Sequence, residues 1–214
     1  FAGFIEKNIG LSPIGILLAA ATIACIGLNV VSTINTFIGA ILALSIYALG
    51  KTYFWPTMLA VAADRFPKTG AIAISMMGGI GMLSAGVIGG PGLGYANDRF
   101  AGQQLAKRNP AVYQQFKSDT PSRLLGLGET YGLDGKKLGE AKATPPSQRT
   151  AAQQAAVEAD QEGNRWTLRA DSAIPATMAV IYLLLFIYFK SIGGYKAVHI
   201  AGTHAAEPIP AGAA

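Results

Sequence analysis

Long uncharged intervals alternate with shorter charged stretches along this 214-residue chain. No Asp, Glu, Lys or Arg occurs between Lys7 and Lys51, and further uncharged intervals cover residues 69–97 and 172–189. About 20 apolar residues suffice to cross a bilayer, and none of these intervals shows a polar face at the helical period. The first interval is long enough for two crossings, with a turn at its polar cluster 29–35. We therefore predict an all-α, polytopic membrane protein with four transmembrane helices. They cover about 9–31, 36–62, 70–95 and 172–190, so that residues 1–95 hold three of them.

Residues 96–171 differ from the rest because they hold most of the charged residues. Asn109 followed by a proline predicts a capped short helix that runs to Phe116. The Ala/Gln/Glu-rich stretch 151–162 predicts a second helix that ends at Gly163. Large apolar residues are few, so we expect a long extramembrane loop that forms a partly ordered cover without a core of its own.

Composition supports membrane insertion, because 51% of the residues are hydrophobic, 14% are charged and the mean hydropathy is +0.36. The net charge of +5 does not indicate a nucleic-acid partner, because the charges gather outside the apolar intervals. The lone cysteine, Cys25, excludes an internal disulfide. Basic residues in the short loop and tail place the termini, including a tail at 191–214, in the cytoplasm. We expect a multi-pass protein embedded in the lipid bilayer of a plasma or bacterial inner membrane.

Lys51 falls near the middle of the second predicted helix. A charge at that depth costs about 2.5–3.5 kcal/mol, so it persists mainly where it meets water, substrate or a counter-charge. Tyr47 and Trp55 lie four residues before and after Lys51 and share its helix face. This combination predicts a pathway for an anionic or hydroxyl-rich solute. The alternative is a structural role, in which Lys51 reaches an interface or pairs with a carboxylate on an absent helix.

Proline and glycine residues predict two further features of the helices. Pro56 removes a helical hydrogen bond and predicts a bend over Gly50 to Pro56, either a gate or a static packing kink. Pro91 lies in a glycine-rich helix end at 89–94 that frees backbone carbonyls and is a second candidate for flexing. Glycines at multiples of four residues predict a close helix-packing face on the third helix. These are Gly78, Gly86, Gly90 and Gly94.

The candidate motifs for cofactor and metal binding are incomplete in this sequence. Gly50-Lys51-Thr52 resembles the end of a phosphate-binding loop, but it lacks the first glycine of that motif and lies in an apolar helix. His199 and His204 have no third metal ligand nearby in the sequence. We therefore expect no enzyme, no cofactor and no metal.

One stretch of the chain carries a family resemblance. The run Lys51-Thr-Tyr-Phe-Trp-Pro-Thr-Met-Leu-Ala, the connection 64–70 and the glycine-rich helix together resemble the tenth and eleventh helices of a major facilitator superfamily transporter. The resemblance implies a cytoplasmic connection and four helices that are the ninth to twelfth of twelve. It also implies a fragment that lacks about eight N-terminal helices. The residues of the connection are Asp64, Arg65, Pro67, Lys68 and Gly70.

The same resemblance implies a function. The chain would belong to a secondary active transporter that moves a small polar solute, a sugar or an organic anion, by alternating access. Lys51, Tyr47 and Trp55 would face the solute, and a proton-carrying acid is expected in the missing part because none lies at membrane depth here. The loop at 96–171 is longer than is usual in the family. The stretch 94–99 is also partly similar to the family's Gly-x-x-x-Asp-Arg signature, which normally lies on the cytoplasmic side. If the stretch is that signature, the predicted orientation in the membrane is inverted. The alternative function is a small membrane subunit that docks onto a larger complex through its glycine-rich helix.

Overall fold

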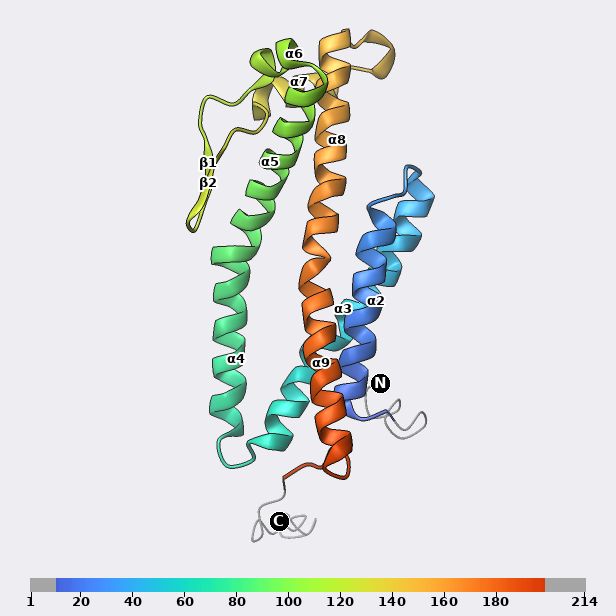
Figure 1. The fold of residues 1–214 in the computed structure, drawn as a ribbon, viewed down its shortest axis with the longest axis vertical. Coiled ribbons are helices and arrows are strands. Elements are labelled where there is room, and N and C mark those ends of the chain that lie inside the picture. Colours follow the sequence, from blue (N-terminus) through green and yellow to red (C-terminus); the bar gives the residue numbers. More distant parts are fainter. Residues whose placement is uncertain (1–10, 199–214) are drawn as a thin grey trace, which may run out of the picture.

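The computed structural model describes residues 11–198, and these are mostly helical (Figure 1). Four helical stretches are long and apolar enough to cross a membrane, which confirms the predicted number of candidate spans. The chain is not wholly helical as expected, because it contains one two-stranded sheet. The ends of the chain, with Lys7, His199 and His204, lie outside the described residues. In chain order the elements are α2 (Pro13–Val31), α3 (Phe37–Arg65), α4 (Gly70–Ser84), the π-helical turn η1 (Ala85–Gly89), α5 (Gly90–Arg108), α6 (Pro110–Phe116), β1 (Ser122–Leu124), β2 (Leu127–Thr130), α7 (Gly135–Ala143), the 3-10 turn η2 (Pro146–Gln148), α8 (Ala151–Asp171) and α9 (Ala173–Ser191).

Polar caps determine where the first two helices begin. The Gly15 N–H donates to Ser12 Oγ over 3.2 Å ahead of α2, and the Gly39 N–H donates to Thr36 Oγ1 over 3.3 Å ahead of α3. Such side chains satisfy backbone donors that have no partner within the helix. α2 and α3 are therefore joined by a short turn within the polar cluster, where the sequence predicts it. α3 continues to Arg65, so the connection to α4 is shorter than expected.

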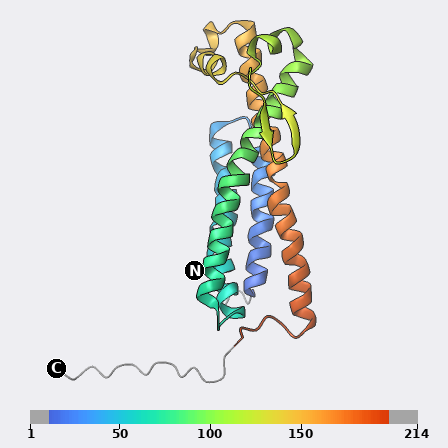
Figure 2. The same cartoon turned by 90° about the vertical axis from the view of Figure 1, so that its left-hand side faces the viewer.

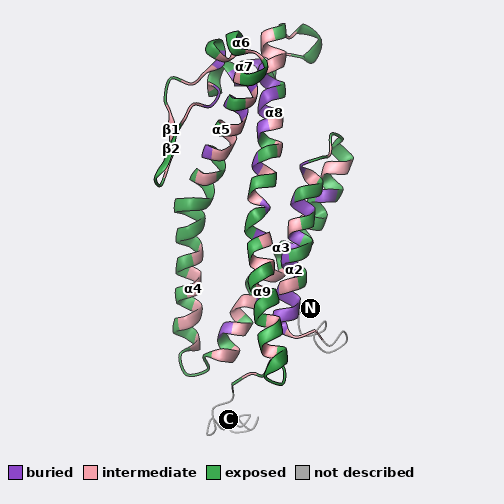
Figure 3. Cartoon of the chain, in the orientation of Figure 1, coloured by how far each residue is buried: buried purple, intermediate pink, exposed green. Residues whose placement is uncertain are grey.

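Small residues allow α2 and α3 to pack closely. A Cβ atom added to Gly27 would lie 2.7 Å from the backbone nitrogen of Tyr47, and one added to Gly50 would lie 2.7 Å from the carbonyl oxygen of Ala20. α9 also packs on α2, since a Cβ on Gly15 would lie 3.5 Å from the Phe186 ring. Buried residues accordingly gather on α2, whereas α4 has none (Figure 3).

The third span is one long helical rod that contains a π-helical turn. The Gly90 N–H bonds to the Ala85 carbonyl five residues earlier, and this wider turn precedes Pro91. π-helical structure occurs mostly as single turns within α-helices, and a proline, which has no N–H to donate, also interrupts the regular helix. The rod therefore continues through Pro91 to Arg108, about 13 residues beyond the end expected from the sequence.

Residues 96–171 form a folded unit at one end of the spans, which we call the head (Figure 2). The expectation that this region lacks a core is wrong. Small side chains replace the missing large ones, because four of the ten core residues are alanines, which let helices approach closely. The core consists of Ala101, Leu105, Val112, Phe116, Leu133, Leu138, Ala141, Ala156, Val157 and Ala159.

Two sequence predictions in the head have opposite outcomes. The short helix is confirmed as α6, with the Val112 N–H donating to Asn109 Oδ1 over 3.2 Å. The predicted helix end at Gly163 is wrong, because α8 continues to Asp171. Gly163 instead lies against α5, where an added Cβ would be 2.7 Å from the backbone nitrogen of Ala101. This glycine serves helix packing and not helix termination.

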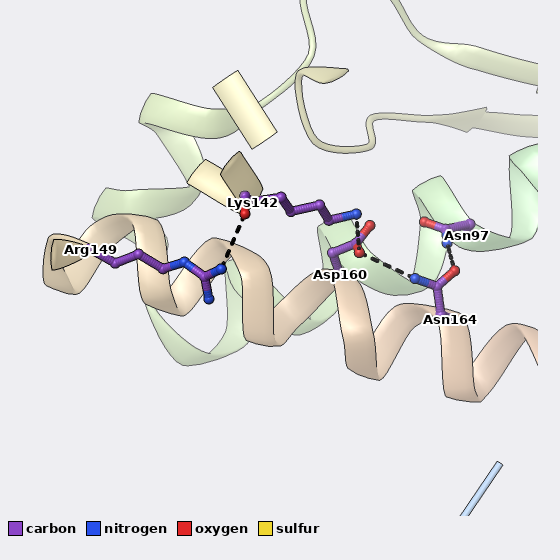
Figure 4. A network of polar contacts seen from close by, with 5 residues as sticks. All are labelled: Asn97, Lys142, Arg149, Asp160 and Asn164. Atoms are coloured by element: carbon purple, nitrogen blue, oxygen red, sulfur yellow. Dashed lines mark hydrogen bonds and ion pairs between the residues drawn. The ribbon is translucent and has the colours of Figure 1, made fainter. Parts of the chain in front are cut away.

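A polar network joins α5, α7 and α8 beside this core (Figure 4). Asp160 is 6% exposed, and one of its carboxylate oxygens lies 2.7 Å from Lys142 Nζ and accepts a hydrogen bond from Asn164 Nδ2 over 3.2 Å. The Asn164 carbonyl in turn accepts from Asn97 Nδ2. Arg149 donates from Nη2 to the Lys142 backbone carbonyl over 3.3 Å. A buried carboxylate with these partners fixes the relative positions of the three helices.

Candidate functional site

The centre of α3 carries the cation predicted to face a solute. Lys51 is the fifteenth of the 29 residues of α3, and its side chain is exposed. Its ammonium nitrogen lies 5.7 Å from the centroid of the Tyr47 ring, a cation–π distance. The structure thus brings Lys51 and Tyr47 together, as their spacing of four residues predicts.

Trp55, the other aromatic residue of this face, lies against α4. A Cβ atom on Gly81 would be 3.2 Å from Trp55 Cζ3, so the glycine leaves room for the indole ring. Trp55 remains 46% exposed. The residue therefore bridges from the Lys51 face of α3 to the glycine-rich helix, a contact that the sequence did not indicate.

Asp171 is a carboxylate that the sequence reasoning left out. It is the last residue of α8 and lies directly before the uncharged interval 172–189. The structural alternative predicted for Lys51 was a carboxylate on an absent helix, and among residues 11–198 Lys51 forms no ion pair.

Asp171 lines a cavity of about 260 Å³ between the third span and the helices α8 and α9. Thr167 and Asp171 are its polar side chains, and the rest of the lining is apolar or backbone. This volume is slightly smaller than the roughly 300 Å³ at which ligand pockets usually begin. The lining residues are Ile88, Gly89, Gly92, Leu93 and Ala96 on one side and Thr167, Ala170, Asp171 and Ile174 on the other.

The glycine face predicted on the third span has no partner in the described part of the chain. A Cβ atom added at Gly78, Gly86, Gly90 or Gly94 would meet nothing within 4 Å. By contrast Gly50, assigned to a bend beside Pro56, is buried against α2. Pro56 lies within a continuous α3, and Pro91 follows the π turn directly.

The connection between α3 and α4 holds the chain that follows α9. The Arg65 guanidinium lies 5.1 Å from the Phe189 ring centroid, and its Nη1 donates to the Lys196 carbonyl over 3.2 Å. Asp64 accepts from the Tyr195 hydroxyl over 3.1 Å. These two residues therefore anchor a neighbouring segment. Among the other predicted loop residues, Pro67 and Lys68 are exposed and Gly70 begins α4.

Comparisons with known proteins give no relative: no protein-family model, curated protein or solved structure matches this chain. Among residues 11–198, no group of three or more His, Cys, Asp and Glu side chains is placed to hold a metal ion.

Proposed function

We propose that this chain forms part of a secondary active transporter that moves a small polar solute, a sugar or an organic anion, across a membrane by alternating access. One observation carries the proposal: an exposed lysine stands at the midpoint of a 29-residue apolar helix, beside the Tyr47 ring. The resemblance of residues 51–60 and 64–70 to a major facilitator superfamily transporter supports the same function.

The energetics favour a role in binding over a purely structural role. A lysine at the centre of a bilayer costs about 2.5–3.5 kcal/mol, which calls for a compensating interaction. Lys51 makes no ion pair with any residue in 11–198. The ammonium group therefore keeps its hydrogen-bond donors available for a carboxylate or hydroxyl groups of a solute. The Tyr47 ring stabilises the cation while the site is empty.

Transport measurements test this proposal. The full-length protein, reconstituted into proteoliposomes, is offered a panel of labelled sugars and organic anions. We expect that Lys51→Ala abolishes uptake of the transported solute at unchanged incorporation and that Asp171→Asn reduces it. Lys68→Ala, which removes an exposed loop charge, is the matched control and should retain uptake. Wild-type uptake by both the Lys51 and Asp171 variants would contradict the proposal.

The open glycine face supports a second candidate function, a small subunit that docks onto a larger membrane complex. Small residues along a helix allow another helix to approach closely, and Gly78, Gly86, Gly90 and Gly94 face open space. For a subunit, Gly86→Leu should release the partner during purification, whereas Lys51→Ala should change nothing. For a transporter, Lys51→Ala should remove uptake while the protein stays assembled.

A further inference from the structure

A second cavity, of about 290 Å³, lies where α8 passes the turn between α2 and α3. It is separate from the Lys51 site and its lining is mainly polar. Figure 1 shows α8 beside the upper end of α2 at this level. The lining residues are Ser32, Thr33, Glu162, Arg165, Trp166 and Arg169.

Two arginines one helical turn apart give this cavity a positive charge. Arg169 donates from Nε to Ser32 Oγ over 3.1 Å, and its guanidinium lies 5.2 Å from the Trp166 ring centroid. Arg165 makes no hydrogen bond or ion pair to the described residues. Glu162 does not neutralise them, because its carboxylate pairs with Arg108 over 2.5 Å. Each arginine thus retains donors that nothing within residues 11–198 satisfies.

The cavity lies at the boundary between the apolar spans and the polar head. The apolar helix α9 begins at Ala173, four residues after Arg169, and α2 ends at Val31, next to Ser32. Trp166 lies 6.3 Å from Phe100, ring centroid to centroid, at the same boundary. Tryptophan is enriched where helices pass through the headgroup layer of a membrane. The two guanidinium groups are therefore placed at the depth of lipid phosphates.

We propose that this cavity binds the phosphate group of an anionic membrane lipid. Planar guanidinium groups match phosphate oxygens in paired, charge-assisted hydrogen bonds, and basic pockets beside membrane helices are typical headgroup sites. Arg165 and the terminal nitrogens of Arg169 would hold the phosphate, and the Thr33 hydroxyl lies on the same lining. The inference rests on insertion of the four spans and is independent of whether the protein transports a solute.

Native mass spectrometry of the full-length protein in detergent tests the inference. Phosphatidylglycerol is compared with phosphatidylcholine of the same acyl chains, and glycerol phosphate serves as the soluble phosphate. We expect retention of phosphatidylglycerol by the wild type, weakened about fivefold for each arginine removed and about 30-fold in Arg165→Gln/Arg169→Gln. Lys107→Gln/Lys136→Gln is the charge-matched control, since both lysines are exposed head residues, and it should bind like the wild type.

The remaining outcomes overturn the inference. Equal retention of the two lipids, or wild-type binding of phosphatidylglycerol by the double variant, would show that the arginines do not select an anionic headgroup. Arginine-dependent binding of glycerol phosphate alone would assign the cavity to a soluble phosphate. Arg165→Gln guards against misfolding as an explanation, because this side chain has no partner among the described residues to lose.

Discussion

The packing of the head makes a specific prediction at Gly163. Gly163 is buried on α8, and an added Cβ would lie 2.7 Å from both the backbone nitrogen and the Cβ of Ala101 on α5. A flexible side chain can rotate away from such a contact, but a backbone nitrogen moves only with its helix. Gly163→Ala should therefore push α5 and α8 apart and disturb the core that they share.

The expected size follows from two opposing effects. Replacing glycine by alanine in a helix interior gains about 1 kcal/mol, because alanine restricts the unfolded chain more and favours the helix. Overpacking a tight core costs roughly 1–3 kcal/mol, and a backbone contact belongs at the upper end of that range. The net loss of head stability should be about 2 kcal/mol, which corresponds to a change of about 30-fold in an equilibrium constant.

Amide hydrogen exchange followed by mass spectrometry measures this loss locally. Peptides from α5 and from the first half of α8 should exchange about 30-fold faster in Gly163→Ala, because exchange there follows opening of the head. Gly139→Ala is the matched control: Gly139 lies in α7, and an added Cβ meets nothing within 4 Å, so it should slow exchange slightly. If exchange slows in both variants, the contact of Gly163 with Ala101 does not limit the packing of α5 on α8, and the prediction is refuted.

Three further outcomes are expected. Gly50→Ala should lower the thermal unfolding temperature in detergent by forcing α2 off α3, whereas Gly78→Ala, which meets open space, should not; equal temperatures would contradict this contact. Thr57→Val should raise that temperature, because the Thr57 hydroxyl is buried without a hydrogen-bond partner in the described chain and valine has nearly the same shape. Burial, and secondarily the charge of Tyr131, raises the pKa of Tyr113 above its ordinary value near 10. The contribution of the protonated Tyr113 to folding stability is therefore complete below about pH 10 and is lost as pH rises through the higher pKa of the folded state. In unfolding experiments at increasing pH, Tyr113→Phe should remove this alkaline loss of stability.

The candidate spans were predictable because their signal is local. Uncharged intervals of more than 20 residues and the polar cluster between the first two helices need no knowledge of tertiary contacts. The cap at Asn109 was predictable for the same reason, since the capping side chain and the donor are three residues apart. Helix existence and local caps therefore followed from the sequence alone.

The errors arose where the cause lies far away in the chain. A glycine within a polar helix looks like a helix end, yet the reason for Gly163 is Ala101, 62 residues earlier. A count of large apolar residues overlooks alanines, which form much of the head core once two helices meet. Contacts between residues so far apart in the chain leave no periodic pattern in the sequence.

Two long helical rods restrict how the proposed site can change shape. One rod consists of α4, η1 and α5, and the other consists of α8 and α9. The head clamps the upper parts of α5 and α8 together through Ala101 and Gly163, so the rods cannot separate there. Below the clamp, the third span has a π turn at Ala85–Gly89, and the other rod changes from α8 to α9 at Ser172. Both points adjoin the cavity that Asp171 lines. Motion that opens this cavity should therefore bend the rods at these two points.

Spin-label distances test this restriction in the proposed transporter. Labels at Ile80 and Ile181, both exposed on the lower parts of the rods, should change their separation when a transported solute is added. Labels at Lys107 and Glu158 in the head should keep theirs, because the α5–α8 clamp lies between them and the spans. If the head pair changes as much as the lower pair, the rods move as rigid bodies and the π turn is not a hinge. If only the lower pair changes, the head acts as a fixed support for bending below it.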